Sequence, residues 1–154
     1  MAVEFFDAPE VREIADELIK RDFPDLLGAV MGYLFKSKAS KSQGKVTLGT
    51  CAKQGASQKA LHGFDYVVTI AQDMWTQLTG EQKEALVYHE LRHTFLDEDK
   101  KGDTQYKILP HDVEMFRDEL KKYGPWRVDL ELLVEQVEKG EVGEKKDNAQ
   151  LSLF

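Results

Sequence analysis

The sequence predicts a small α+β domain. An amphipathic helical pattern comes first, three apolar or β-branched segments follow, and the remaining periodic segments are helical. At 154 residues the chain is long enough for one domain with a core of its own. We therefore expect residues 1–138 to form that domain. Residues 139–154 begin with a polar run that has few apolar groups to bury, so we expect a flexible tail.

The first half of the chain should contain one helix and the sheet. Asp7 and Glu10 are spaced like a capping pair that opens a helix running to about Arg21. Apolar residues recur along this segment at helical spacing, which predicts a buried face. Loop residues separate the apolar segments that come next, and these are expected to be the strands of a three-stranded sheet, at residues 29–36, 45–51 and 65–71.

The second half should be helical. Thr79 with Gln82 is another capping signal, and it opens a helix that we expect to reach about Leu96. A loop should then occupy residues 97–109. Gly124 divides the rest of the domain into two further predicted helices, at residues 110–123 and 125–138.

The central helix carries the sequence His89-Glu90-Leu91-Arg92-His93, a His-Glu-x-x-His motif. Residues four apart lie on one face of a helix, so the imidazoles of His89 and His93 can converge on one metal ion. Glu90 then lies beside them and can act as a base. A zinc hydrolase is the function that this motif favours, and a degenerate or purely structural remnant is the alternative.

The helix around the motif is apolar on two sides. Val87, Leu91 and Phe95 form one stripe, and Leu86 lies on the same side as the two histidines. Polar side chains in such a helix need partners, because an unpaired polar group in a dry setting costs about 2 kcal/mol or more. A metal ion with its bound water would provide partners for His89, His93 and Glu90.

Catalytic zinc usually has three protein ligands and leaves its fourth position to water. His111 is the best candidate for the third ligand, because it follows Pro110 at the expected start of a helix. Glu114 lies three residues further on and could face the same site, either as the alternative ligand or as a supporting partner. His62 lies in a glycine-containing segment and is interpreted as a surface loop histidine.

The sequence His-Glu-Leu-x-His, followed by Leu-Pro-His-Asp-Val-Glu-x-Phe, resembles the phage metallopeptidases, which are related to the SprT and Spartan type of zinc proteases. The similarity covers residues 64–123 and, more loosely, residues 1–138. The resemblance implies a minimal zincin fold. It also implies zinc bound by His89, His93 and His111, with Glu90 as the catalytic base of a metalloendopeptidase.

In such a mechanism zinc lowers the pKa of its bound water to about 7, and Glu90 takes the proton and passes it to the leaving amine. Tyr106, Tyr123 and Arg92 are candidates for stabilising the oxyanion. The strand at residues 65–71 could offer its edge to an extended substrate peptide, or it could be an internal strand.

The last five residues, Gln150-Leu151-Ser152-Leu153-Phe154, follow the polar run of the tail. Three large apolar side chains at the end of a tether either fold back on the domain or enter a partner's pocket. The pentapeptide closely resembles the motif by which bacterial proteins bind the β sliding clamp. That resemblance implies that Gln150 enters a polar subsite, while Leu151, Leu153 and Phe154 fill a hydrophobic cleft. A tethered peptide raises the effective concentration of the domain near the clamp.

Charge is distributed unevenly along the chain. The net charge is −7, but residues 26–64 contain six lysines and no acidic residue. Lys36, Lys38, Lys41 and Lys45 could therefore contact DNA, or they could protect exposed sheet edges from pairing. The single Cys51 excludes an internal disulfide, and the N-terminal residues do not resemble a signal peptide or a membrane span. A cytoplasmic location is the expectation.

The first hypothesis is therefore a zinc metalloprotease recruited to DNA replication and repair sites through the sliding clamp. As the Spartan resemblance implies, it would act on DNA-associated proteins. The second is a nonenzymatic clamp ligand or inhibitor in which the metal only holds the fold together. A zinc hydrolase of a nonpeptide amide is a third, weaker hypothesis.

Overall fold

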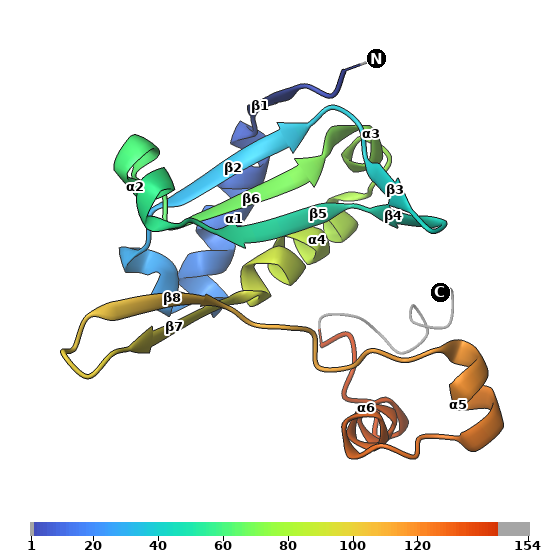
Figure 1. Ribbon diagram of the computed structural model, residues 1–154. Coiled ribbons are helices and arrows are strands. Elements are labelled where there is room, and N and C mark those ends of the chain that lie inside the picture. Colours follow the sequence, from blue (N-terminus) through green and yellow to red (C-terminus); the bar gives the residue numbers. More distant parts are fainter. Residues whose placement is uncertain (1, 145–154) are drawn as a thin grey trace. The chain divides into compact units, whose positions relative to one another are not determined.

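The structure is a computed structural model, and it describes residues 2–144. The chain divides into two compact units, the first ending at Pro110 and the second beginning at His111. The α+β class predicted from the sequence is confirmed, since helices and small sheets alternate along the chain (Figure 1).

The first unit is built on a four-stranded sheet with the strand order β1-β2-β6-β5 (Figure 1). The two central strands are parallel to each other, and each outer strand runs antiparallel to its neighbour. The three predicted strands supply β2, β5 and β6, whereas β1 was not predicted because it is only three residues long. The strand bounds are Phe5–Asp7 for β1, Met31–Lys36 for β2, Gly49–Lys53 for β5 and Tyr66–Ala71 for β6.

The predicted strand at residues 45–51 is in fact two strands. β4 (Lys45–Thr47) forms a hairpin with β3 (Ser40–Ser42), and β5 then begins at Gly49 and joins the main sheet. β6 is paired on both sides, so of the two alternatives for this strand the internal position is confirmed and the edge that receives a peptide is wrong. A nearly continuous apolar run is typical of an internal strand. Within residues 2–144, the edge strand on this side is β5, which pairs only with β6.

Helix α1 (Pro9–Asp22) lies where the first helix was predicted, but it begins differently. Asp7 is part of β1, where it is the register partner of Leu34, and the N-cap residue is Ala8 without a side-chain hydrogen bond. The predicted Asp7–Glu10 capping pair is therefore wrong. Pro9 occupies the first turn, where its fixed φ angle favours the helix and its missing N–H costs nothing.

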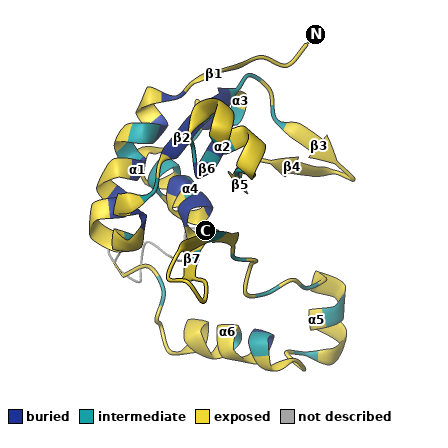
Figure 2. Cartoon of the chain, turned by 60° about the vertical axis from the view of Figure 1, so that its left-hand side comes forward, coloured by how far each residue is buried: buried dark blue, intermediate teal, exposed yellow. Residues whose placement is uncertain are grey.

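The core lies between the sheet and the two long helices α1 and α4 (Gly80–Arg92). Alternate residues of the central strands point to this face, and each helix contributes a buried stripe (Figure 2). The main buried side chains are Val11, Ala15 and Leu18 of α1, Tyr33 and Phe35 of β2, Val68 and Ile70 of β6, and Val87 and Leu91 of α4.

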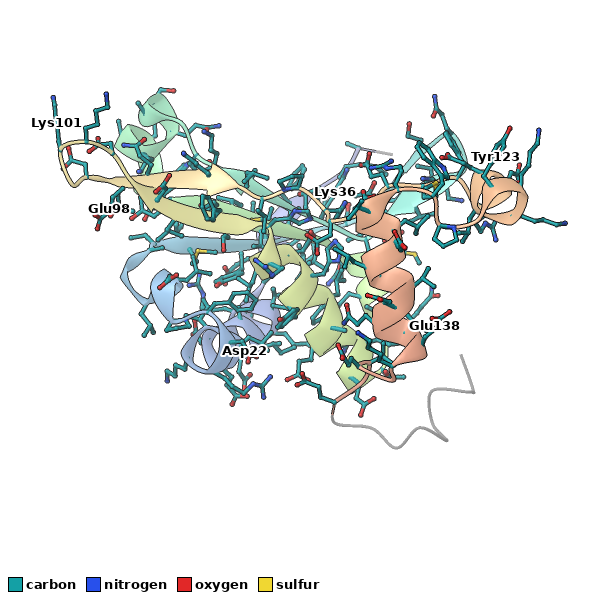
Figure 3. All side chains as sticks on the ribbon, turned by 90° about the horizontal axis from the view of Figure 1, so that it is seen from below. Asp22, Lys36, Glu98, Lys101, Tyr123 and Glu138 are labelled. Atoms are coloured by element: carbon teal, nitrogen blue, oxygen red, sulfur yellow. The ribbon has the colours of Figure 1, made fainter. Side chains whose placement is uncertain are left out.

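The predicted motif helix is shorter than expected, because it ends at Arg92 instead of Leu96. The Thr94 hydroxyl donates to the Leu91 carbonyl at 2.7 Å, which satisfies one of the last carbonyls of the helix. The predicted loop at residues 97–109 is mostly a hairpin of β7 (Thr94–Glu98) and β8 (Thr104–Ile108). Glu98 and Lys101 mark its tip, which projects away from α4 (Figure 3).

Short elements complete the first unit. They are the 3-10 helix η1 (Pro24–Gly28), α2 (Ala56–His62) and α3 (Gln72–Trp75), and none of the three was predicted.

The second unit contains α5 (Arg117–Tyr123) and α6 (Val128–Glu138), both shorter than predicted. Residues 110–116 are not helical, so the prediction that His111 opens a helix is wrong. Phe116, a large apolar residue of this segment, is 79% exposed, so it adds nothing to a buried face. Helical turns without tertiary packing are marginal in water. Across residues 2–144, no helix is both long enough and apolar enough to cross a membrane.

Candidate metal centre

Helix α4 positions the first two histidines, and its start is fixed as predicted. The Thr79 hydroxyl accepts the Gln82 backbone N–H at 3.2 Å, and the Gln82 side chain accepts the Thr79 N–H at 3.0 Å. This reciprocal pair satisfies two of the N–H groups that a helix start leaves without partners.

The two faces of α4 differ in burial, and the predicted apolar stripe is confirmed only in part, because Phe95 lies on β7 and is 44% exposed. Val87 and Leu91 are fully buried in the core. His89 is exposed and His93, the C-cap residue, is half-buried, with the centroids of their rings 5.2 Å apart. Glu90 lies between these faces with only 2% of its surface exposed. The helix therefore anchors a buried carboxylate directly beside two imidazoles.

A backbone contact fixes the orientation of His93. Its Nδ1 lies 2.7 Å from the carbonyl oxygen of Leu109, and the Leu109 N–H donates to the His93 carbonyl at 2.6 Å. Because a carbonyl can only accept, Nδ1 carries the proton in this contact. The lone pair of the neutral ring is then on Nε2, which is the arrangement found in metal-binding histidines.

The hairpin that carries Leu109 is itself tied to the sheet. The buried Tyr66 hydroxyl on β6 lies 2.7 Å from the Lys107 carbonyl and 3.2 Å from the Phe95 carbonyl, one on each strand of the hairpin. The rings of Tyr66 and Tyr106 also meet edge to face, with centroids 5.7 Å apart. The sheet thus positions the strand end whose carbonyl orients His93.

His111 completes the histidine cluster. One nitrogen from each of His89, His93 and His111 lies within 4.8 Å of the other two, and this is the one group of three or more potential ligand residues found among residues 2–144. Leu109, which is hydrogen-bonded to His93, lies two residues before His111 in the chain. Three imidazoles are a donor set that suits a divalent transition-metal ion.

Other predicted participants lie elsewhere. Glu114 is not part of the cluster, and its main-chain carbonyl accepts from the Arg127 side chain at 3.4 Å. His62 is the last residue of α2, where its Nδ1 accepts the Phe64 N–H at 3.0 Å. His62 is exposed as predicted, but it belongs to a helix end and not to a loop.

The oxyanion candidates are not supported by their surroundings. Tyr106 packs on Tyr66 and under the Lys59 ammonium group, which lies 4.5 Å from its ring centroid. Arg92 lines a separate groove that also contains Asp22. Neither residue lines the cleft that contains His89 and Glu90. Tyr123 ends α5 in the second unit.

Gly49, at the start of β5, provides the space in which the Glu90 carboxylate lies. A Cβ atom added to Gly49 would lie 3.1 Å from Oε2 of Glu90 and 2.9 Å from Cδ1 of Ile70. This contact was not predicted from the sequence. The available signal was a glycine beginning a strand, which often marks a close approach of the backbone to another group.

Burial is the main influence on the pKa of Glu90. It raises the pKa of the Glu90 carboxyl, and the nearby charge of His93 opposes that shift. Cys51, on the same strand as Gly49, has its pKa raised to about 12, first by burial and second by the charge of Glu90. Cys51 therefore remains a neutral thiol and is not part of the histidine cluster.

A cleft of about 530 Å³ opens beside His89 and Glu90. One wall is the stretch from the end of β4 to the start of β5, and the other is the exposed side of α4. We call it the apolar cleft; its lining residues are Thr47, Leu48, Gly49, Leu78, Gln82, Ala85, Leu86, His89 and Glu90.

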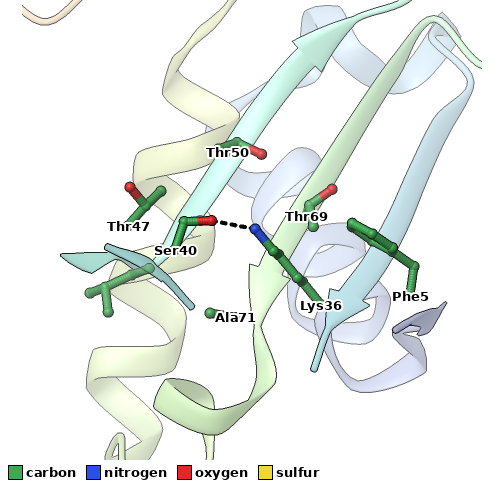
Figure 4. A pocket seen from close by; sticks show the side chains of 9 residues that line it. Phe5, Lys36, Ser40, Thr47, Thr50, Thr69 and Ala71 are labelled. Atoms are coloured by element: carbon green, nitrogen blue, oxygen red, sulfur yellow. Dashed lines mark hydrogen bonds between the residues drawn. The ribbon is translucent and has the colours of Figure 1, made fainter. Parts of the chain in front are cut away.

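Residues 47–49 also line a second, smaller pocket of about 160 Å³ (Figure 4). Within it the Lys36 ammonium group is hydrogen-bonded to the Ser40 hydroxyl. Thr50 and Thr69, which are register partners on β5 and β6, add two more hydroxyl groups.

Taken together, the small α+β fold and the histidine cluster beside a buried carboxylate are the features of a metallopeptidase-like domain, and the cluster suggests a metal ion. The chain belongs to the family described as putative phage metallopeptidase, whose model matches residues 3–138. No curated protein and no solved structure matches the chain. The clamp-binding motif predicted at residues 150–154 lies outside both the match and the described residues.

Proposed function

We propose that the chain is a zinc-dependent metalloendopeptidase of the His-Glu-x-x-His type. His89, His93 and His111 hold the ion, and Glu90 is the catalytic base. The observation that carries the proposal is the convergence of three imidazoles beside a buried carboxylate in a domain of this family. Zinc is the preferred ion because three neutral imidazoles with one open position are a common catalytic zinc environment.

When bound, the ion supplies Lewis-acid chemistry, polarising a peptide carbonyl and making water acidic enough to ionise near neutral pH. His93 contributes through its fixed orientation, which points the unprotonated nitrogen away from Leu109. Glu90 accepts the proton of the attacking water and returns it to the leaving amine. Its burial favours this role, because a carboxylate with a raised pKa is a stronger base.

The edge of β5 is the proposed support for the substrate backbone. Gly49 places the start of this strand against Glu90, and no described strand pairs with the outer edge of β5. An extended peptide can add to such an edge through main-chain hydrogen bonds. The strand at residues 65–71, for which the sequence left both an edge and an internal position open, is the internal neighbour of β5.

Glu90→Gln tests the chemistry. The zinc-loaded variant should keep one zinc ion per chain, while hydrolysis of an unstructured protein substrate falls by roughly 1000-fold, in line with the loss of a general base. Glu84→Gln is the matched control, since Glu84 lies on the same helix and pairs with Arg21 at the surface. Zinc content would be measured by elemental analysis and hydrolysis by release of new amino termini.

Unchanged hydrolysis in Glu90→Gln would contradict the proposal. If the Glu90→Gln variant also bound the sliding clamp as the original chain does, a nonenzymatic clamp ligand with a structural metal site would be favoured instead.

We further propose that the C-terminal pentapeptide recruits the enzyme to the β sliding clamp. Support comes from the resemblance of residues 150–154 to the clamp-binding motif and from their place after a polar run. Replacing Leu153 and Phe154 by alanine should abolish binding to purified clamp in a titration. Hydrolysis of a free peptide should stay unchanged, which separates recruitment from catalysis.

DNA contact through Lys36, Lys38, Lys41 and Lys45 is a third part of the proposal, and it places the targets among DNA-associated proteins. These lysines lie in the acid-free segment of the chain, around the β3–β4 hairpin next to the pocket of Figure 4. Replacing all four by glutamine should weaken DNA binding. It should also reduce the slope of log affinity against log salt by up to about 0.9 for each phosphate that the variant no longer neutralises. An unchanged slope would refute the DNA contact.

A further inference from the structure

The apolar cleft lies directly beside the residues proposed to carry out the chemistry, since His89 and Glu90 form part of its wall. Along α4 the lining residues follow helical spacing and lead up to His89. The cleft is therefore an extension of the proposed active site along the helix and not a separate cavity.

The walls of the cleft are mainly hydrocarbon. Leu48 comes from the β4–β5 side, and Leu78, Ala85 and Leu86 come from α4 and the turn before it. The side-chain oxygen of Gln82 is already engaged by the Thr79 N–H. Apart from Glu90, the lining contains no carboxylate, and it contains no lysine or arginine. A negatively charged substrate group placed here would lose hydration without gaining a partner of opposite charge, and a positively charged group would find only the carboxylate of Glu90.

We propose that the apolar cleft binds one large apolar side chain of the substrate, leucine or phenylalanine, at the residue adjoining the peptide bond to be cut. The proposal rests on the proposed peptidase function and names its substrate class. A cleft of about 530 Å³ is ample for such a side chain together with the backbone that carries it. Burial against Leu48 and Leu86 supplies the selectivity, because a buried leucine or phenylalanine gains free energy that a charged residue does not.

The first experiment measures hydrolysis. The zinc-loaded full chain is given peptides that differ at a single position, occupied by leucine, phenylalanine, alanine, aspartate or lysine. We expect kcat/KM for leucine or phenylalanine to exceed that for aspartate or lysine by about tenfold or more at one position next to the cleaved bond.

A substitution in the cleft gives the matched comparison. Ala85 is exposed in the free protein, so Ala85→Phe should fill the cleft with little cost to folding. The variant should lose the preference for leucine and phenylalanine, so that the ratio of kcat/KM between the leucine and aspartate peptides falls toward one. Ala60→Phe is the control, since Ala60 is also an exposed helical alanine but lies on α2, outside the cleft. Ala85→Leu, a smaller change, should give a graded loss and serves if Ala85→Phe does not fold.

A binding measurement tests the cleft without catalysis. In the Glu90→Gln chain, a fluorescein-labelled leucine peptide should bind at least about tenfold more tightly than its aspartate counterpart, and adding Ala85→Phe should remove the difference. Selective binding without any hydrolysis by the original chain would overturn the peptidase function and leave the cleft assignment standing. Equal binding of both peptides, or selectivity that survives Ala85→Phe, would overturn the cleft assignment.

Discussion

The three histidines come from two regions that differ in how they are positioned. His89 and His93 are held by α4, whose start is capped and whose buried stripe of Val87 and Leu91 is fixed in the core. His111 lies in residues 110–116, which have no regular structure, and it is exposed. Leu109, two residues before it, directly follows β8 of the β7–β8 hairpin and is hydrogen-bonded to the carbonyl and the ring of His93. Periodicity within one helix therefore places two ligands, whereas the place of the third follows from no local pattern.

The largest effect should come from removing one ligand at a time. Replacing His89 or His93 by alanine breaks the pair on the helix and should weaken zinc affinity more than the roughly 100-fold that loss of an outer-sphere partner can cost. His111→Ala should have a smaller effect, because the helix still presents two imidazoles. Competition with a chelating indicator would measure the affinities.

His62→Ala is the control, since His62 is outside the cluster. If His111→Ala behaved like this control, His111 would not be a ligand, and the comparison between the two regions would lose its basis.

Gly49→Ala tests how closely the first region is packed around Glu90. The added Cβ would come within 3.1 Å of the carboxylate, so we expect kcat to fall by roughly tenfold while zinc affinity is kept, which corresponds to about 1.4 kcal/mol of activation free energy. Gly28→Ala should have no effect on kcat, because nothing lies within 4 Å of a Cβ at that position.

The same substitution also crowds Ile70, so a second variant separates the two contacts. Ile70→Val removes the crowded Cδ1 atom. If Gly49→Ala regained full activity in the Ile70→Val background, the loss would be due to strand packing, and the positioning of Glu90 by Gly49 would be refuted.

Tyr66→Phe tests the link between the two regions. Loss of the hydroxyl leaves the Lys107 carbonyl without this donor, which should cost about 1–2 kcal/mol of unfolding free energy. Because the hairpin then holds Leu109 less firmly against His93, zinc affinity should fall by up to about tenfold. Urea unfolding and the indicator titration would measure the two effects, with Tyr123→Phe as an exposed control. A loss of stability with unchanged zinc affinity would show that the hairpin does not position the metal site.

The difference between the two regions also explains which features of the structure could be predicted from the sequence. The motif, the capping pair of Thr79 and Gln82 and the two faces of α4 were predictable, because each depends on the spacing of residues within one helix. The edge position of β5 and the contact of Gly49 with Glu90 were not, because they depend on strand order. The helix expected at His111 was wrong, because the apolar pattern of residues 113–120 suggests a buried face and Phe116 is exposed. Periodicity indicates which face could be buried but not whether another element covers it.

The smallest expected effect is on the rate at which Cys51 is alkylated. This rate reports on the first region alone, because Cys51 lies on β5 beside Glu90. The thiolate is the form that iodoacetamide attacks, and burial together with the charge of Glu90 raises the pKa of Cys51 to about 12, so alkylation at pH 8 should be slow in the folded chain. In the unfolded chain the thiol should ionise near its ordinary pKa of 9.0. The stability that this thiol contributes is therefore complete below pH 9 and is lost as the pH rises from 9 toward about 12.

Glu90→Gln removes the second cause of the shift and should lower the pKa of Cys51, which speeds alkylation at pH 8 by a small factor; a slower reaction would contradict the assigned cause. His111→Ala should leave the rate unchanged, because α4 and β5 are packed together by the core and not by the third ligand. Mass spectrometry of the alkylated chain would follow both variants. If His111→Ala accelerated the reaction as well, the packing of α4 against β5 would depend on the third histidine, and the contrast between the two regions would fail.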